Sequence, residues 1–298
     1  MYMNSLYVVA VVWTFNPKIE YLIEALKSVA DQVNHLIIVD NGSSNVNQIR
    51  SMCGAFSNVT LIELSANLGV RALNVGMIYA VERYDPECIL LLDDDTSVYY
   101  NAIPRILGIL KGSKLYELVG AICMYSGNRK ITVFWRGGMF SGCLVKAELI
   151  KRGIKVREDF FLDQADHDFF DRIRRSDYLT IRYEDRGLIN HKLGVLLKFC
   201  IKLPFVGVLN RYEPPWRYYY MVRNSTVLLM EGKLDIEFYI RQLVAFLVPM
   251  LFVDGIIRSF KALILGITHG LTKKLGYLDP YTVGLLSTKG LDRLSNNG

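Results

Sequence analysis

The sequence contains few cysteines, histidines and prolines. Only 5 cysteines, 4 histidines and 8 prolines occur among 298 residues, and no two cysteines form a Cys-x-x-Cys pair. Scattered cysteines argue against a disulfide framework and against a zinc site built from paired thiolates. The spacing therefore predicts reduced cysteines and favours a cytoplasmic protein.

Charge of one sign does not dominate the sequence. It has 35 Lys and Arg against 29 Asp and Glu, a net charge of +6. This balance excludes a basic nucleic-acid-binding arm and an acidic tail, so we expect no nucleic-acid partner. The basic excess is confined to residues 192–298, which hold 14 basic and 7 acidic residues.

A long hydrophobic run is also missing. The uncharged, mostly apolar run at residues 242–253 has 12 residues. As a helix it would extend roughly 18 Å, short of the ~30 Å hydrocarbon core of a bilayer. The apolar run at 6–13 has no preceding Lys or Arg, so we interpret it as a buried strand and not as a signal peptide. We therefore expect no membrane-spanning segment.

Residues 1 to about 125 alternate short apolar runs with amphipathic segments. Continuous Val, Ile and Leu runs are typical of strands buried on both faces, as in a mostly parallel sheet with helices on both sides. The sequence thus predicts a doubly wound, Rossmann-like α/β fold. The predicted strands are 6–13, 36–39, 59–64 and 88–92, and the predicted helices are 18–31, 46–53 and 71–83.

Polar residues follow each of these four strands. In doubly wound sheets the ligand lies at the carboxyl ends of the strands, where such residues converge. We therefore expect a ligand site there. The residues are Thr14 and Asn16 after the first strand, Asp40 and Asn41 after the second, Asn67 after the third, and Asp93, Asp94 and Asp95 after the fourth.

The acidic triplet is a candidate metal site. Carboxylates this close repel one another unless a cation lies among them. Because side chains alternate along an extended segment, Asp93 and Asp95 are expected to face one ion while Asp94 points elsewhere. A few hard oxygen ligands suit Mg²⁺ or Mn²⁺ shared with a diphosphate. The alternative is a solvated acidic turn that caps the next helix.

The ordered series of motifs closely resembles the family 2 glycosyltransferases of GT-A fold, and within them the rhamnosyltransferase and galactofuranosyltransferase branch. Each motif is weak alone, but the series covers residues 5 to about 225 in order. The matching segments are 11–16, 38–43, 67–76, 93–95, 139–142, 159–172, 191–194 and 219–224.

The resemblance implies roles for individual residues. Asp93 and Asp95 match the family's metal-binding Asp-x-Asp motif, and His191 matches a histidine that completes the metal shell in some members. Asp166 matches the general base, although the acidic residue that often precedes this base is Ala165 here. The resemblance places the other candidates at the nucleotide and donor sugar: Thr14, Asn16, Asp40, Asn41, Asn67, Arg71 and Asp94.

The implied activity is inverting, metal-dependent transfer of a sugar from a UDP- or dTDP-linked donor to a hydroxyl of a glycan or a lipid-linked acceptor. One base and one metal suffice for inversion, because the base takes the proton of the attacking alcohol while the cation neutralises the leaving diphosphate. Two alternatives remain: a catalytically inactive nucleotide-sugar-binding module and a metal-dependent phosphotransferase. The segment after the first strand is not a phosphate-binding loop, which disfavours the phosphotransferase.

Several residues keep a purely structural alternative. Asp166 stands where a helix would begin and is then an N-cap. His191 is then an ordinary loop histidine, and the glycines around Ser141 then form a tight turn. Asp168 and Asp171 are expected to form salt bridges on the helix surface with the arginines that follow them.

The sequence predicts two regions. Residues 1–191 form the GT-A catalytic domain, with a nucleotide-sugar half (about 1–125) and an acceptor half (about 126–191). Residues 192–298 form a helical, basic region with amphipathic helices at 192–203 and 258–274. Such helices bind anionic membrane surfaces, so we expect a peripheral enzyme on the cytoplasmic membrane face. Packing of these helices on the catalytic domain is the alternative, and the oligomeric state stays open.

Overall fold

A computed structural model describes residues 6–112, 116–133, 138–192 and 195–287, apart from the Lys198 side chain. The chain forms two compact units. The N-terminal unit comprises residues Met1–Arg157 and Asp166–Lys192, and the C-terminal unit comprises Glu158–Ala165 and Leu193–Gly298. The short segment just before Asp166 thus belongs to the C-terminal unit.

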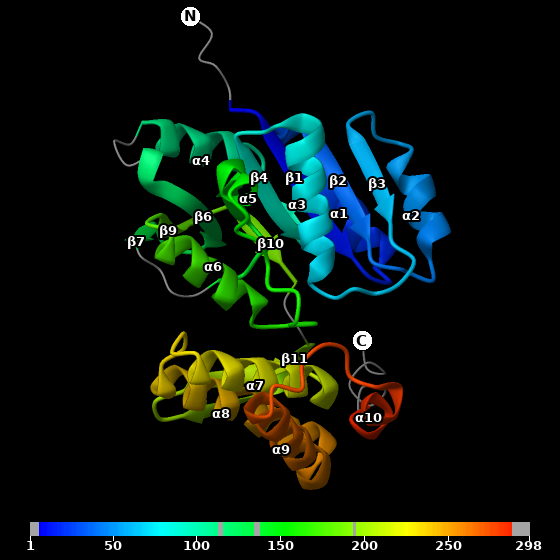
Figure 1. Ribbon diagram of the computed structural model, residues 1–298, viewed down its shortest axis with the longest axis vertical. Helices are drawn as coiled ribbons and strands as arrows, with labels where there is room; N and C mark the ends of the chain where they lie inside the picture. Colours follow the sequence, from blue (N-terminus) through cyan, green and yellow to red (C-terminus); the bar gives the residue numbers. More distant parts are fainter. Residues whose placement is uncertain (1–5, 113–115, 134–137, 193–194, 288–298) are drawn as a thin grey trace, which may run out of the picture. The chain divides into compact units, whose positions relative to one another are not determined.

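The N-terminal unit is built on one mixed sheet (Figure 1). Within the described part of the chain, this sheet has eight strands in the order β3-β2-β1-β4-β8-β6-β9-β7. All of them run in one direction except β8 and β7, which are antiparallel to their neighbours. The strands are β1 (Val8–Thr14), β2 (His35–Asp40), β3 (Val59–Glu63), β4 (Cys88–Asp93), β6 (Val119–Ser126), β7 (Lys130–Val133), β8 (Cys143–Lys146) and β9 (Leu179–Asp185).

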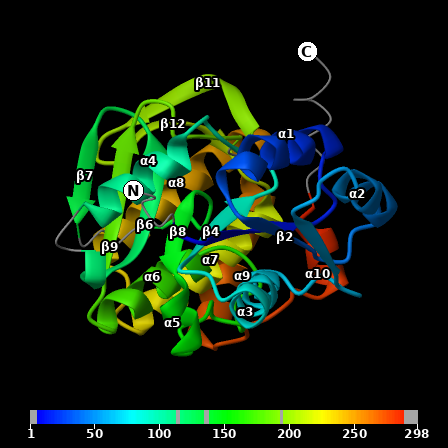
Figure 2. The same cartoon turned by 90° about the horizontal axis from the view of Figure 1, so that it is seen from above.

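Helices cover both faces of this sheet, as the sequence predicts. Figure 2 shows α1, α2 and α4 on one face and α3, α5 and α6 on the other. The strand β1 explains why both faces need cover, because its residues from Val8 to Val12 are all buried. The helices are α1 (Ile19–Val29), α2 (Val46–Cys53), α3 (Arg71–Tyr84), α4 (Ala102–Lys111), α5 (Ala147–Lys151) and α6 (Ala165–Arg175), with 3₁₀ turns at Ala30–Gln32 and Tyr116–Leu118.

The helix α3 approaches the sheet closely at a glycine. A Cβ atom added to Gly76 would lie 2.4 Å from Cγ1 of Val11 and 2.9 Å from Cγ2 of Val39. These γ-carbons belong to buried, β-branched side chains that have little freedom to move aside. A side chain at this position is therefore excluded, and α3 is held directly over β1 and β2.

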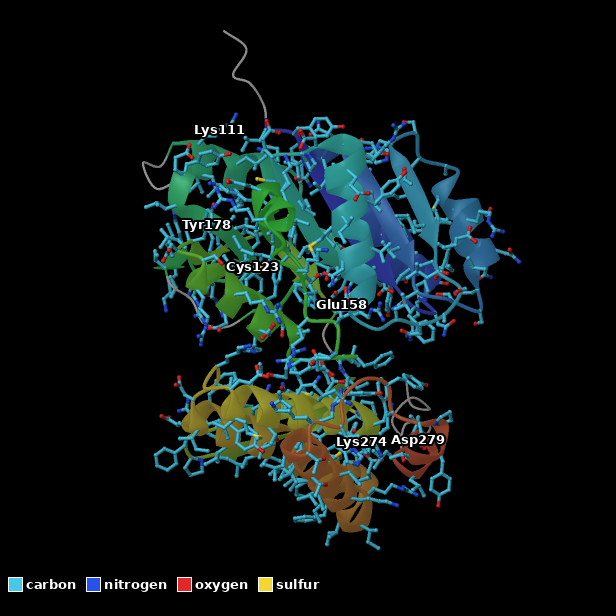
Figure 3. The ribbon with its side chains drawn as sticks, in the orientation of Figure 1. Lys111, Cys123, Glu158, Tyr178, Lys274 and Asp279 are labelled. Carbon is cyan, nitrogen blue, oxygen red and sulfur yellow. A yellow bond between two sulfur atoms is a disulfide. The ribbon has the colours of Figure 1, made fainter. Side chains whose placement is uncertain are left out.

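The cysteine prediction is wrong for one pair. Cys123 on β6 and Cys143 on β8 face each other in the antiparallel register and form a disulfide (Figure 3, Cys123 labelled). Sequence spacing did not reveal the pair because the two residues are 20 positions apart and meet only through strand pairing. Cys53, Cys88 and Cys200 are free thiols.

The C-terminal unit begins with a hairpin where an amphipathic helix was predicted. Residues 193 and 194 of the predicted helix lie outside the described residues, and from Val195 onward the segment is a strand: β11 (Val195–Leu203) pairs antiparallel with β12 (Gly207–Tyr212). A short isolated helix is marginal in water. Here a second apolar segment follows directly after a turn at Pro204, so pairing satisfies the backbone of both segments.

Helices make up the rest of the described C-terminal unit, namely α7 (Pro215–Met230), α8 (Ile236–Asp254), α9 (Ile256–Leu271) and α10 (Pro280–Leu285). Almost all of α7 is buried, including Tyr218, Tyr219 and Tyr220, each about 1% exposed. These tyrosines, with Tyr212, belong to the hydrophobic core of this unit.

The length of α8 corrects the expectation that no segment is long enough to cross a membrane. The helix has 19 residues. Its most apolar stretch of 18 residues has a mean hydropathy of 1.7, and only 17% of that stretch is buried. Counting only the uncharged run missed the first turns, which include Glu237 and Arg241. Among the described residues, α8 is the one helix that is long and apolar enough to cross a membrane. One such helix is weak evidence for a membrane span.

Candidate active site

The carboxyl ends of β1, β2 and β4 lie side by side and carry most of the predicted site. These strands are parallel neighbours, with Thr14 paired to Asp40 and Trp13 paired to Asp93. The edge they share is the one at which doubly wound sheets bind ligands. The polar residues after each strand are therefore gathered at one place by the sheet topology.

A second small sheet brings His191 to this edge. The strands β5 (Thr96–Val98) and β10 (Ile189–His191) pair antiparallel, with His191 opposite Thr96. This pairing places the imidazole Nε2 of His191 3.3 Å from Oδ2 of Asp93 and 3.3 Å from Oδ1 of Asp95. The structure thus brings His191 to two carboxylates that precede it by almost 100 positions in the sequence.

The geometry of Asp93, Asp95 and His191 suits a metal ion. One potential ligand atom from each residue lies within 4.8 Å of the others. Two carboxylates and an imidazole are ligands of Mg²⁺, Mn²⁺ and related cations. Burial lowers the pKa of His191, but the hydrogen bonds and negative charge of the two carboxylates outweigh it and raise the pKa to about 9. A positive charge is thus strongly favoured between these carboxylates.

Asp94 points away from this group, as the alternation predicts. Its Oδ2 accepts a hydrogen bond of 2.5 Å from the hydroxyl of Thr14. Burial and the negative charges of Asp93 and Asp95 raise the pKa of Asp94 to about 7, although the hydrogen bond from Thr14 lowers it. The hydrogen bond between Thr14 and Asp94 therefore links the end of β1 to the segment after β4. Its strength depends on whether the Asp94 carboxyl is protonated.

The end of β2 holds a buried carboxylate. Asp40 is 1% exposed, and its Oδ2 accepts a hydrogen bond from the backbone N–H of Ser43. Its other oxygen, Oδ1, is buried and has no hydrogen-bond partner in the described part of the chain. A buried carboxylate oxygen without a partner costs free energy, so it is suited to a ligand hydroxyl or N–H.

The loop after β1 is held against the loop after β2. The backbone N–H of Asn16 donates to the hydroxyl of Ser43, and Oδ1 of Asn16 accepts from both N–H and Oγ of Ser44. Asn16 has a φ of 50°, a left-handed conformation that Asn tolerates. Its side chain is thus engaged in shaping the loop.

Asn41 and Asn67 also shape the edge. The amide of Asn41 donates to Oδ1 of Asn67 and to the carbonyl of Gly69, and accepts from the backbone N–H of Leu68. These bonds fold the segment after β3 onto the end of β2. The segment leads directly to Arg71, which is exposed as the first residue of α3.

Asp166 lies at the start of α6, on the other half of the sheet. Its Oδ1 accepts from the backbone N–H of His167, and its charge acts on the phenol of Tyr125 near the end of β6. The next residue of β6, Ser126, is hydrogen bonded to the backbone of Ile189 in β10. Through these contacts Asp166 belongs to the same end of the sheet as His191.

The other acidic residues of α6 are paired. Asp168 is fully buried and bound to Nε of Arg172 at 2.6 Å, while Asp171 binds both Arg174 and Arg175 at 2.6 Å. The predicted salt bridges are therefore present, but they are buried at the carboxylate end and not at the surface. The ion pairs of Asp168 and Asp171 stabilise α6.

Sequence reasoning missed two residues that fix the acidic segment. Nε1 of Trp13 donates to Oδ1 of Asp93 at 2.7 Å. The hydroxyl of Ser141 accepts from the backbone N–H of Asp93 at 2.9 Å and donates to the hydroxyl of Thr96 at 2.7 Å. Because Trp13 directly precedes the candidate residue Thr14, its position in the sequence could have indicated a role in the site. The glycines near Ser141 drew attention to a turn instead, and Gly137 lies outside the described residues.

A further missed contact lies in the C-terminal unit. The amide of Asn224 on α7 donates to the carbonyls of Leu162 and Asp163, and the guanidinium of Arg217 binds the Asp163 carboxylate at 3.2 Å. Asp163 and Gln164 both have left-handed φ values, 55° and 62°. The segment leading into Asp166 is thus held in an unusual conformation by α7.

Comparison with known proteins agrees with this geometry. The model for "Glycosyl transferase family 2" matches residues 9–164. The dTDP-rhamnosyl transferase RfbF of Shigella flexneri is 25% identical over 266 residues, which cover 81% of this chain and 86% of that protein. A hyaluronan synthase of Streptococcus pyogenes is 32% identical over 123 residues, 38% of this chain, and the match spans only 29% of the synthase.

The fold is also found in a solved structure. The crystal structure of residues 1–349 of S. aureus TarS aligns with a TM-score of 0.54 over 90% of this chain and 82% of that one, at 13% identity. Such low identity supports the fold alone. The family model covers the strands β1 to β4 and the acidic segment, more than half of the chain, and on this ground the protein belongs to glycosyl transferase family 2, with the GT-A fold of that family.

Proposed function

We propose that this glycosyltransferase moves a sugar, with inversion, from a nucleoside-diphosphate sugar to a hydroxyl of a glycan or lipid-linked acceptor. The observation that carries the proposal is the meeting of Asp93, Asp95 and His191 at the end of β4, on the same edge of the sheet as the buried carboxylate of Asp40 at the end of β2. A cation-binding group and an unpartnered buried acceptor on one edge suit a diphosphate joined to a nucleoside.

We assign the divalent cation, Mn²⁺ or Mg²⁺, to Asp93, Asp95 and His191. The donor set fits, because two carboxylate oxygens and one imidazole nitrogen lie close enough to share one ion. When bound, the cation neutralises the charge that develops on the leaving diphosphate. Trp13 and Ser141 orient Asp93 for this task through the indole and hydroxyl contacts.

The remaining predicted residues divide into two groups. Asp40 and Arg71 are the proposed direct contacts to the donor, through a free carboxylate oxygen and an exposed guanidinium at the edge of the sheet. Thr14, Asn16, Asn41, Asn67 and Asp94 mainly shape the donor site, because their side chains are hydrogen bonded to neighbouring loops and strand ends.

Asp166 is the proposed general base. It accepts the proton of the acceptor hydroxyl as that oxygen attacks the anomeric carbon, and a positioned carboxylate gives about 10² to 10⁴ in rate. Asp168 and Asp171 are unsuitable for this role because both carboxylates are bound to arginines. Within the described part of α6, Asp166 is thus the best candidate.

The donor is proposed to be a dTDP-linked deoxyhexose, with UDP-linked sugars as the second choice. The support is the similarity to a dTDP-rhamnosyl transferase over 81% of this chain. This is a proposal about specificity, since 25% identity leaves the sugar pocket free to differ.

The test is release of nucleoside diphosphate from a panel of dTDP- and UDP-sugars, with Mn²⁺, with Mg²⁺ and with excess EDTA. We expect turnover of at least one donor with metal and none with EDTA. Asp95→Asn should lose metal-dependent activity, while Asp31→Asn, at an exposed position away from the site, should keep it. Full turnover in EDTA would remove the metal from the proposal, and no turnover of any donor would favour an inactive nucleotide-sugar-binding module.

A further inference from the structure

The helix α9 turns its small residues inward. Ser259, Ala262, Gly266 and Gly270 are its buried positions. A Cβ atom on Gly266 would lie 2.7 Å from Cβ of Val222, and one on Gly270 would lie 2.8 Å from the carbonyl oxygen of Arg223. The inner face of α9 is therefore filled by close backbone contact with α7, and its large apolar side chains have no place there.

Those large side chains lie on the opposite face. At 3.6 residues per turn they fall within an arc of about 120°. Thr268 shares the arc, but its hydroxyl is bonded to the carbonyl of Ile264 one turn earlier. The arc has no charged residue. Its apolar members are Ile256 (69% exposed), Ile257 (84%), Phe260 (42%), Ile264 (58%) and Leu271 (54%).

The preceding helix extends this apolar surface. Phe252, near the end of α8, is 67% exposed. Gly255 separates α8 from α9, which begins with the exposed Ile256 and Ile257. We call Phe252 and the apolar arc of α9 the outward apolar surface.

The helix α8 is nevertheless fixed to its own unit. Tyr239 is hydrogen bonded to Thr226, Gln242 accepts from Ser225, and the carbonyl of Leu243 accepts from the hydroxyl of Tyr218. At its other end Asp254 accepts from Tyr212 at 2.6 Å. A helix bonded along its length to α7 and β12 is suited to lying along a bilayer surface and not to crossing it.

Basic residues border the outward apolar surface. Lys261 lies at the edge of the α9 arc, and Lys273 and Lys274 follow the end of α9, exposed (Figure 3, Lys274 labelled). With Arg258 they make four basic residues in 256–287, where Asp279 is the only acidic one. An apolar stripe flanked by basic side chains complements anionic lipid headgroups over an acyl layer.

From these contacts we propose that the outward apolar surface docks this enzyme in the interface of an anionic lipid bilayer. A protein partner is less suitable, because protein interfaces carry about one hydrogen bond per 100–200 Å². The α9 arc offers only one hydroxyl, already bonded within the helix. The α9 part of this surface coincides with the predicted amphipathic helix at 258–274, whereas residues 195–203 of the other predicted helix form a strand. The proposal does not depend on which sugar is transferred.

The test is flotation of the full chain with vesicles of phosphatidylcholine alone or mixed with phosphatidylglycerol, at low and high salt. We expect binding to the mixed vesicles at low salt and weaker binding at high salt. The double variant Ile257→Gln and Ile264→Gln should lose most of this binding. Ile131→Gln, at a similarly exposed apolar position on β7, should leave it unchanged.

A second variant tests the charges separately. Lys273→Gln with Lys274→Gln should weaken binding to the mixed vesicles by about fivefold for each lysine, with little effect on neutral ones. The proposal is overturned if the full chain stays unbound to mixed vesicles at low salt. It is overturned equally if the Ile257 and Ile264 variant binds like the parent, or if it only dissociates a dimer in sedimentation experiments.

Discussion

At the scale of single residues, the site depends on charges that are held close together. Asp93, Asp95 and His191 form one group, and Asp94 is half-buried beside it. Neutral groups outside β4 maintain this arrangement: the indole of Trp13 and the hydroxyl of Thr14 donate to Asp93 and Asp94, and the hydroxyl of Ser141 accepts from the backbone N–H of Asp93. Changes at these groups should therefore affect metal binding without removing a ligand.

Ser141→Ala tests this at the acidic segment. The change removes the acceptor of the backbone N–H of Asp93, and a buried group left unpaired costs about 1–3 kcal/mol. We expect Mn²⁺ affinity, measured by calorimetry, to fall at least severalfold. Ser176→Ala, an exposed serine after α6, is the matched control and should bind Mn²⁺ normally. Unchanged Mn²⁺ affinity in the Ser141 variant would contradict the positioning role.

The metal-free protein should lose stability as pH rises. His191 has its pKa raised to about 9 from 6.5, so the folded state holds an extra proton between these values. Asp94, with its pKa raised to about 7 from 3.8, acts in the same direction at lower pH. The free energy of unfolding should therefore fall from about pH 4 to pH 9, by up to about 3 kcal/mol for His191.

Urea unfolding in EDTA at pH 6.5 and pH 9 measures this difference. His191→Gln should flatten the change between these two pH values, because the titrating group is gone. Added Mn²⁺ should restore stability most at the higher pH, where the imidazole is neutral. A metal-free protein as stable at pH 9 as at pH 6.5 would show that His191 does not face the two carboxylates.

At the scale of elements, local pattern predicted the N-terminal half well. The helix at 46–53 is found with the predicted bounds, and the predicted strands at 36–39 and 88–92 are extended by only one residue at one or both ends. These elements carry their signal locally, as buried β-branched runs and 3.6-residue periodicity. The hairpin at 195–212 was missed because its structure depends on pairing between two segments, which periodicity within one segment does not report.

Gly76→Ala tests how α3 sits on the sheet. In an exposed helix, replacing Gly by Ala stabilises by up to about 1 kcal/mol. At Gly76 the new Cβ would overlap Val11, and we expect a loss of about 1–3 kcal/mol instead. The control is Gly108→Ala in α4, where a Cβ meets nothing within 4 Å, and this variant should be as stable as the parent or more stable.

The overlap can be relieved from the other side. Adding Val11→Ala to Gly76→Ala removes the γ-carbon that the new Cβ would meet. The double variant should therefore lose less stability in urea unfolding than the sum of the two single variants. Simple additivity would indicate that α3 does not pack against β1 at this position.

At the scale of the whole molecule, sequence motifs located residues that the structure brings together, but not the contacts that hold them. The order of motifs along the chain identified the acidic segment and His191, and the β5–β10 pairing accounts for their meeting. The disulfide escaped prediction, since it depends on the pairing of two strands that are distant in sequence. The two units have separate cores, so the roles assigned to each are separable by mutation.

The central claim is that one end of the sheet holds a metal-dependent donor site and, at Asp166, a separate base for the acceptor. Asp166→Asn removes the base and leaves Asp93, Asp95 and His191 intact. The control is Asp177→Asn, an exposed residue just after α6 whose left-handed φ of 65° Asn also tolerates.

The decisive measurement pairs calorimetry of nucleoside-diphosphate binding in Mn²⁺ with the rate of sugar transfer, on the same Asp166→Asn preparation. We expect parental affinity for the nucleoside diphosphate and a transfer rate about 10² to 10⁴ lower. Normal transfer by the variant would show that Asp166 is a helix cap and not the base. Loss of nucleotide binding together with transfer would contradict the separation of base and donor site.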